Sequence, residues 1–434
     1  MELRTLIVRV QERVRRGDLT IFYSRALTFT LGIYIFIIPF PHRTALQEIC
    51  FYSSLALFAL FYGLKKQSIS FKTPLTGPFF LFAAWVFVSL FFSIDQKNSF
   101  HDFFAYLMKD ITLFFLVYNT FVSKKDFVFL TRLIIVSGGI FSLGGMIYFY
   151  GILKMPIWMR IGLPEVGLGG NYIGYVTALA IFFSIAQFLH SRSNFGTWVS
   201  LFSVTGATLI TLLAQVKGTL LGFIPLFAML FEKKRVLILV LMIVGPLLLV
   251  MPVKRIFTTD PDVLRRLDGG RIEILHYYIP FIKDHPVTGI GFGMQTYRQE
   301  LINPNSEIIK GSKDLFAPHN TFVDVAVRCG IPGLVFFLYI LFAFARTGLG
   351  LIRKSEVPFI KKWALCLMAV FASYLIQGFF SDMLLGIQVK YFFILLAMMA
   401  ILWKWHIEEP DESNDAKPEL SLRTSQTEGS RAQI

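Results

Sequence analysis

Long apolar stretches separated by short charged segments run along most of the 434-residue chain. Each stretch is about as long as a helix must be to cross a bilayer, roughly 20 residues. Barrel strands would be shorter and would alternate apolar with polar residues. The pattern predicts an all-α, polytopic membrane protein, because a helix satisfies its own backbone in lipid. About 12 transmembrane helices are expected, over residues 20–38, 46–64, 77–94, 103–122, 127–150, 171–189, 195–213, 218–231, 236–252, 333–345, 363–380 and 388–403.

One long polar segment, residues 253–332, interrupts this pattern between the ninth and tenth predicted helices. Basic clusters flank the other apolar stretches alternately, which places both chain ends in the cytoplasm and the long segment outside. The predicted organisation is a basic cytoplasmic N-terminus (1–19), nine helices (20–252), a large outer loop (253–332), three helices (333–404) and a disordered cytoplasmic tail (405–434).

Composition supports a membrane protein and explains the charge. Hydrophobic residues make up 55% of the chain and the mean hydropathy is +0.62, which is too apolar for a soluble domain of this length. The net charge of +14 could indicate nucleic-acid binding. Most Lys and Arg residues lie between apolar stretches, however, so the charge is interpreted as topogenic. Arg160 and Lys217 lie in short outer segments, where the bias disfavours basic residues. Their presence there therefore needs an explanation other than membrane topology.

The outer loop has its own local structure. Residues 271–283 have the spacing of an amphipathic helix, with Pro286 marking its end. The apolar face of this helix could rest on the bundle or on the membrane surface, and its predicted members are Ile272, Leu275, Ile279 and Ile282. The glycine-rich run Gly289–Gly293 does not have dinucleotide-fingerprint spacing and follows no predicted strand. It is interpreted as a flexible turn.

Arginines in the outer loop are candidates for binding a lipid diphosphate. Guanidinium groups bind phosphate oxygens in a planar, bidentate way and stay charged. A diphosphate presented from the bilayer would suit this loop. Contacts with ordinary anionic lipid, or ion pairs with nearby aspartates, would explain the same arginines. The arginines are Arg255, Arg265, Arg266 and Arg271, and the aspartates are Asp260, Asp262 and Asp268.

His319 is the candidate general base, because imidazole exchanges a proton near neutral pH. Pro318 before it and a predicted helix start after it would fix its position. A purely structural role is the alternative. Lys109 and Asp110 lie in a predicted span, and adjacent helical residues do not face each other, so they are expected to meet separate partners. No carboxylate pair or Cys/His cluster indicates a metal, and Cys50, Cys329 and Cys366 show no disulfide spacing.

Two motifs resemble the O-antigen ligase and polymerase superfamily. His319-Asn320, nine residues and then Gly330-x-x-Gly333 is similar to that family's pattern. Arg271, in Gly-Gly-Arg-Ile-Glu-Ile-Leu, lies in a segment similar to the one that precedes this pattern in the family. Asn320, Gly330 and Gly333 would support the site.

Two earlier segments extend the resemblance. The outer loop with Arg160, followed by Gly170-Asn171, is similar to an arginine-bearing loop of the family. Val216-Lys217-Gly218 stands where the family usually has Ser-Arg-Gly. Lysine is a point charge and not a planar fork, so this departure weakens bidentate phosphate binding at Lys217.

The resemblance implies a glycosyltransferase of the bacterial inner membrane, with loop 253–332 as its periplasmic catalytic loop. The donor would be a polyprenyl-diphosphate-linked glycan, with no cofactor, metal or nucleic acid. His319 and Arg271 would be catalytic. The diphosphate would be bound by Arg160, Lys217, Arg255, Arg265 and Arg266. Arginines could stabilise the leaving group, while His319 would deprotonate the attacking hydroxyl, with inversion at the anomeric carbon.

Three functions remain open at this point. A ligase would transfer the glycan to a sugar of the lipid A core. An O-antigen or exopolysaccharide polymerase would transfer it to a growing glycan, and some relatives use protein hydroxyls. A transporter or flippase is a different class, but transporters tend to place polar residues at the membrane midplane. Here they concentrate in one outer loop, which argues against transport. The ligase is the first choice, with the polymerase as the alternative.

Overall fold

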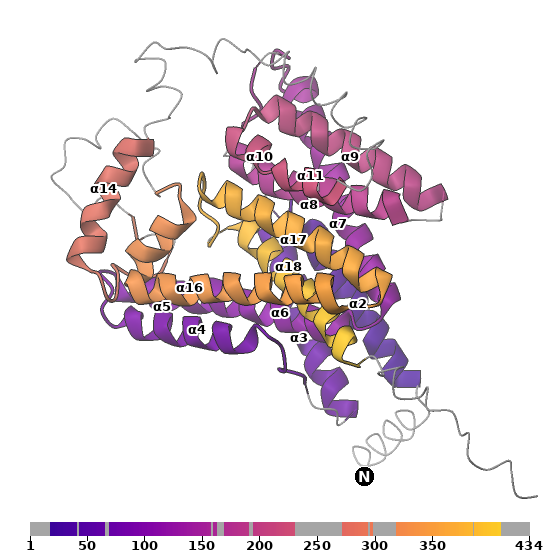
Figure 1. Cartoon of the computed structure of the whole chain (residues 1–434), viewed down its shortest axis with the longest axis horizontal. Coiled ribbons are helices and arrows are strands. Elements are labelled where there is room, and N and C mark those ends of the chain that lie inside the picture. Colours follow the sequence, from indigo (N-terminus) through magenta and orange to yellow (C-terminus); the bar gives the residue numbers. More distant parts are fainter. Residues whose placement is uncertain are drawn as a thin grey trace, which may run out of the picture.

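The computed structural model describes residues 18–40, 43–65, 69–157, 159–162, 169–190, 194–230, 271–293, 296–297, 318–384 and 386–408. Every regular element within these ranges is a helix, and two short elements, η1 and η2, are π-helical. The elements, with the labels of Figure 1, are α2 (Asp18–Ile37), α3 (Thr44–Lys65), α4 (Thr76–Leu90), α5 (Gln96–Asp102), η1 (Phe103–Met108), α6 (Lys109–Thr120), α7 (Lys124–Met146), η2 (Ile147–Ile152), α8 (Gly170–His190), α9 (Asn194–Ala214), α10 (Lys217–Leu221), α11 (Ile224–Leu230), α14 (Arg271–Asp284), α16 (Thr321–Lys354), α17 (Pro358–Gly378) and α18 (Ile387–Glu408).

Seven of the described helices are long and apolar enough to cross a membrane, and two shorter apolar helices, Ile21–Ile37 and Thr76–Leu90, accompany them. The prediction of a multi-pass, all-helical protein is therefore confirmed for the described part of the chain. The predicted span 236–252 lies outside the described residues. The total of twelve spans and the periplasmic position of the long loop stay predictions.

Three predicted spans differ from the observed helices. The span predicted at 103–122 begins with the π-helical η1 and continues as α6. The described part of the span at 218–231 is two short helices, α10 and α11. The span at 333–345 is part of the 34-residue α16. That helix continues past Arg346 to Lys354, and two basic side chains in its last turn, Arg353 and Lys354, complement the helix dipole.

The bundle is organised around α18, which packs against α6, α8, α16 and α17. Its residues 391–402 are all buried, as expected for a helix that is apolar on every side. Large apolar side chains on the outer helices are instead exposed, among them Phe80 and Trp198, each 71% exposed. Such a surface suits hydrocarbon rather than water.

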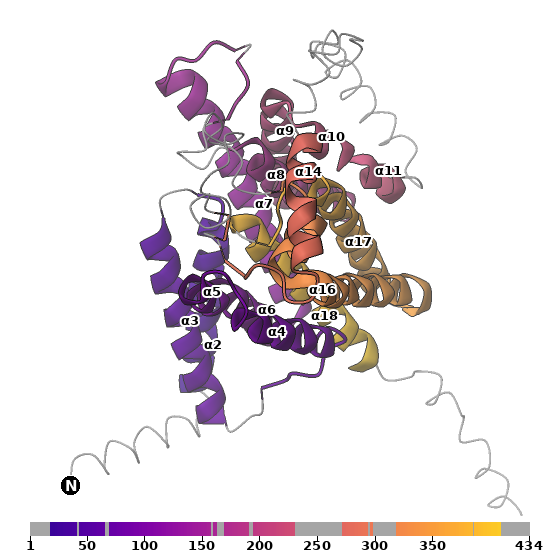
Figure 2. The same cartoon turned by 90° about the vertical axis from the view of Figure 1, so that its left-hand side faces the viewer.

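Segments predicted to share one side of the membrane meet at the same end of the bundle. At the end predicted as cytoplasmic, the Tyr62 hydroxyl donates to the Asn119 carbonyl at 3.1 Å. The Trp405 indole donates to the Val122 carbonyl there at 2.8 Å. At the opposite end, Figures 1 and 2 place α14 beside the start of α16. Which end faces the periplasm stays a prediction.

Candidate functional site

The helix α16 is broken at Gly330, where φ is 72° and ψ is 179°. A Cβ atom at this position would lie 1.9 Å from the Val287 carbonyl oxygen, and a positive φ favours glycine. Pro332 follows and has no N–H, so the Arg328 carbonyl has no helical partner four residues ahead. That carbonyl instead accepts from the Gly291 N–H at 3.0 Å.

The other backbone groups of the broken turn are also bonded outside α16. The pairs, donor first, are Ile290 N–H to Val327 carbonyl at 2.9 Å, Trp85 indole to Cys329 carbonyl at 2.8 Å, and Ile331 N–H to Pro286 carbonyl at 2.8 Å. Buried backbone groups need partners. The break in α16 therefore provides a docking place for residues 286–293, called here the glycine turn.

The glycine turn packs on its other side against the connection between α4 and α5. Ile94 N–H donates to the Ile290 carbonyl at 3.0 Å. Gly291 has φ 124°, and a Cβ atom there would lie 1.9 Å from Ser93 Oγ. Residues 289–293 are all buried. The segment is a turn, as predicted, and its glycines allow close packing between two elements; its predicted flexibility stays a prediction.

The predicted helix at 271–283 is confirmed as α14, yet a different face packs on the bundle. Ile274 and Tyr278 are buried against Ile290, Tyr297 and Val327. The predicted face does not pack on the bundle at Ile279, which is 41% exposed, and its contact with the membrane surface stays a prediction. It was chosen from aliphatic residues alone, whereas the large aromatic side chain of Tyr278 offers more area to bury.

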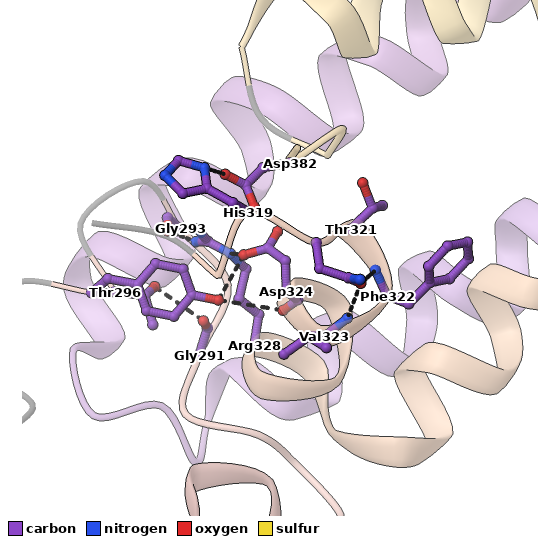
Figure 3. A network of polar contacts seen from close by, with 12 residues as sticks. Gly291, Gly293, Thr296, His319, Thr321, Phe322, Val323, Asp324, Arg328 and Asp382 are labelled. Atoms are coloured by element: carbon purple, nitrogen blue, oxygen red, sulfur yellow. Dashed lines mark hydrogen bonds and ion pairs between the residues drawn. The ribbon is translucent and has the colours of Figure 1, made fainter. Parts of the chain in front are cut away.

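A buried charged cluster lies where the glycine turn meets α16 (Figure 3). Arg328 Nε donates to Asp324 Oδ1 at 2.7 Å, and Arg328 Nη1 donates to the Gly293 carbonyl. The Tyr297 hydroxyl donates to the same Asp324 oxygen at 2.6 Å. Burial raises the pKa of Tyr297 well above its usual value, although Arg328 opposes this shift, so the phenol stays protonated. These residues, Tyr297, Asp324 and Arg328, are called here the clamp.

His319 lies just before the first turn of α16, beside an acidic side chain. Its Nδ1 atom is 3.5 Å from Asp382 Oδ2, and the two side chains are 35% and 19% exposed. The backbone of His319 has φ 49°, a conformation that few residues other than glycine adopt. The imidazole lies beside Asp382 (Figure 3), and part of its side chain stays exposed.

The start of α16 is fixed by its cap and by the connection between α17 and α18. The Asn320 side chain accepts from the N–H groups of Phe322 and Val323, as an N-cap does. Its Nδ2 atom donates to the Phe379 carbonyl at 3.3 Å, and Thr321 Oγ1 donates to the Ser381 carbonyl at 2.8 Å. These bonds hold the segment that carries Asp382 against the segment that carries His319.

Arg160 lies against the junction of α9 and α10. Its Nε atom donates to the Ala214 carbonyl at 2.8 Å, close to where α10 begins at Lys217. A Cβ atom on Gly218 would lie 3.0 Å from Phe380 Cβ. The junction therefore touches the same α17–α18 connection that holds Asp382. Arg160, the backbone of Lys217 and His319 thus lie at one end of the bundle.

The remaining predicted basic residues are not placed relative to His319. Arg271 begins α14, but its side chain lies outside the described residues, as do the side chain of Lys217 and all of Arg255, Arg265 and Arg266. Their convergence with His319 stays a prediction. In the described ranges, no group of three or more His, Cys, Asp or Glu side chains could hold a metal ion. The metal-independent reaction also stays a prediction.

Several residues of this site were missed by sequence reasoning. Asp382 is an isolated acid between two apolar stretches, and that position was the available signal. The four-residue spacing of Asp324 and Arg328 is typical of a helical ion pair and was also visible. Tyr297 gave no such signal, because its contact with Asp324 depends on the fold of the glycine turn.

A second group of charged side chains lies where α3, α6 and α18 meet. Lys109 Nζ donates to both carboxylate oxygens of Glu48, each at 2.5 Å. Lys390 Nζ donates to Gln47 Oε1 at 3.0 Å and lies within electrostatic reach of the buried Asp110. The separate partner predicted for Lys109 is confirmed, whereas Asp110 lies in the field of both Lys390 and Lys109. These five residues are called here the interior cluster.

Comparisons with known proteins agree with the motifs. The model of a family described as O-Antigen ligase matches residues 172–338, a segment from α8 to the second half of α16 that includes Arg271 and His319. A protein of Rickettsia felis named "Putative polysaccharide ligase" is 25% identical over 288 residues, which cover 61% of this chain and 67% of that protein. Both findings support a relationship of this chain to the O-antigen ligase superfamily, with the matched domain at residues 172–338.

Proposed function

We propose that this protein transfers a glycan from a polyprenyl-diphosphate carrier to a lipid A-core sugar hydroxyl, at the periplasmic face of the bacterial inner membrane. The family match and the relative support a function of the O-antigen ligase or polymerase type. The apolar helices support a multi-pass membrane enzyme. A donor anchored in the bilayer would present its diphosphate at the end of the bundle where His319 lies.

The observation that carries the proposal is the His319–Asp382 pair. A carboxylate near Nδ1 at 3.5 Å favours the tautomer with its proton on that nitrogen and leaves Nε2 to accept one. His319 Nε2 takes the proton of the acceptor hydroxyl, whose oxygen attacks the anomeric carbon. The bond from that carbon to the diphosphate breaks with inversion. Asp382 stabilises the imidazolium until the proton passes to water.

Basic residues supply the second half of the proposed chemistry. Negative charge develops on the diphosphate as it leaves, and preorganised cations stabilise such charge strongly in a water-poor site. Arg271, Arg160 and Lys217 are the proposed contacts, together with Arg255, Arg265 and Arg266. Arg160 is held by its Nε contact with the Ala214 carbonyl at 2.8 Å, at the same end of the bundle as His319.

The test uses a strain without the chromosomal gene, complemented with variants. His319→Ala and Arg271→Ala are expected to abolish glycan transfer while the protein accumulates in the membrane. His285→Ala is the matched control, because this exposed histidine lies in the same loop and has no proposed role. Full transfer by either of the first two variants would refute the role given to that residue.

The same strain separates a ligase from a polymerase. Without a ligase, lipopolysaccharide on a gel is bare core, and long glycan stays on the carrier lipid. Without a polymerase, the core carries a single repeat unit, and that outcome would replace the proposed acceptor with a growing glycan. The name of the Rickettsia felis relative favours the ligase.

A further inference from the structure

The proposed chemistry makes no use of the clamp, although its charges are among the most deeply buried in the described part of the chain. The side chains of Arg328 and Asp324 are 4% and 0% exposed. A buried ion pair adds little net stability to a fold, because the cost of desolvation offsets most of the attraction. An apolar pair of similar volume often stabilises the fold equally well. The arrangement of these charges therefore calls for another reason.

Arg328 contacts two elements that are far apart in the sequence. Within α16 it binds Asp324, one helical turn earlier, at 2.7 Å. Outside α16 it donates to the Gly293 carbonyl and lies over the Tyr297 ring, with its Cζ atom 4.3 Å from the ring centroid. A planar guanidinium can make these contacts together, because its donors form a rigid fork.

The two elements joined by Arg328 lead to the two residues proposed to react. On one side, Asp324 N–H donates to the Asn320 carbonyl at 2.8 Å, directly after His319. On the other side, the Tyr297 ring packs edge-on against Tyr278 of α14, with centroids 5.0 Å apart. Arg271 begins that helix. The clamp thus fixes α14 relative to the start of α16.

The clamp also lies within the electrostatic field of the carboxylate beside His319. Asp382 interacts with both Asp324 and Arg328 through space. Asp324 Oδ2 and Asp382 Oδ1 are both buried without a hydrogen-bond partner among the described residues. Two such carboxylates repel each other, and the Arg328 guanidinium, which attracts both, offsets part of this repulsion. Apolar residues could fill the space of the clamp but could not provide this charge.

We propose that Arg328 is a positioning residue: through Asp324 and Tyr297 it sets where α14, which begins at Arg271, lies relative to His319, and it supports Asp382 as the charged partner of that histidine. This inference rests on the proposed function. It predicts that apolar side chains filling the clamp would support folding but not full glycan transfer. A correctly folded protein without these charges should therefore transfer glycan poorly.

The test compares a single with a double variant, in liposomes supplied with extracted polyprenyl-diphosphate glycan and lipid A core. Arg328→Met leaves Asp324 buried and unpaired, and it should lower the unfolding temperature. Asp324→Leu combined with Arg328→Met replaces the pair with apolar side chains, and it should restore that temperature. Turnover per folded molecule should still be about 100-fold lower in the double variant, as for a misplaced reacting group, with a donor KM within about 3-fold of the original.

Tyr297→Phe tests the same proposal with a smaller change to the structure. It keeps the ring that packs on Tyr278 and removes only the hydroxyl that binds Asp324. The protein should fold normally, and turnover should fall by about 10-fold, the effect of losing one supporting hydrogen bond. If the double variant does not accumulate, this substitution decides the matter, and unchanged turnover would overturn the proposal.

The outcomes separate this inference from the proposed function. If His319→Ala abolishes transfer while the double variant and Tyr297→Phe turn over within about 3-fold of the original protein, the clamp is structural only. If His319→Ala still transfers glycan, the proposed base is wrong, whatever the clamp variants do. Arg328→Lys should fall between, because lysine can pair with Asp324 but cannot fork to the Gly293 carbonyl.

Discussion

The clamp and the interior cluster contain similar residue types but hold different kinds of structure. In the interior cluster, contacts run between side chains on separate helices, as for Lys109 with Glu48. In the clamp, Arg328 donates to a backbone carbonyl of the glycine turn. A helix satisfies its own backbone, whereas a turn leaves carbonyls unpaired. Side-chain pairs therefore fix helices, while side chains bound to backbone fix the loops that carry the candidate site.

The largest difference between the site around His319 and the interior cluster should appear in the rate of glycan transfer. Asp382→Asn keeps the shape beside His319 but removes its charge, and it should lower transfer by about 100-fold, as for other second-layer partners of a reacting group. Glu48→Gln is the matched change in the interior cluster and should leave transfer per folded molecule nearly unchanged. Both would be measured as glycan on core, normalised to protein in the membrane. Equal losses would show that the two regions do not differ in role.

The next effect concerns stability, and here a change in the interior cluster should matter although it leaves transfer nearly unchanged. Lys109→Met removes the partner of Glu48 in a pair whose side chains are 11% and 39% exposed. The free energy of unfolding should fall by about 1–2 kcal/mol, between the values for exposed and buried pairs. Thermal unfolding in detergent would measure it, with the exposed Lys361→Met as control. Loss of turnover without loss of stability would mean that the interior cluster also serves the reaction.

The smallest effect, again on stability, should come from Trp85, which contacts the broken turn of α16 beside the glycine turn. Trp85→Phe removes the hydrogen bond to the Cys329 carbonyl, which is 2.8 Å long. Stability should fall by about 1 kcal/mol, the usual net value of one such bond. Trp198→Phe is the control, because Trp198 is 71% exposed on the apolar surface. Equal unfolding temperatures for the two variants would contradict the importance given to that bond.

Local sequence patterns were enough to place most helices. Apolar stretches predicted α8 at 171–189 and α17 at 363–380, close to Gly170–His190 and Pro358–Gly378. The amphipathic spacing of 271–283 predicted α14 to within one residue. These elements depend on hydrophobic periodicity within one segment, and that property can be read without knowing the fold.

The parts that could not be predicted depend on contacts between distant segments. Gly330 and Pro332 looked like the end of a loop, because nothing nearby could bond the carbonyls they release. The helix continues since Ile290, Gly291 and Trp85 supply donors from elsewhere. The pairing of His319 with Asp382 likewise joins the starts and ends of different helices. Motifs identified His319, but only the fold identified its neighbour.

The break in α16 attaches the glycine turn through backbone groups, which side-chain substitutions do not remove. Its bonds to Ile290 and Gly291 run from backbone to backbone, so replacing the Ile290 side chain would change packing without removing an anchor. Pro332→Ala would add a backbone N–H that competes with Gly291 for the Arg328 carbonyl. The side chains of the glycine turn can therefore change while its backbone hydrogen bonds to α16 remain.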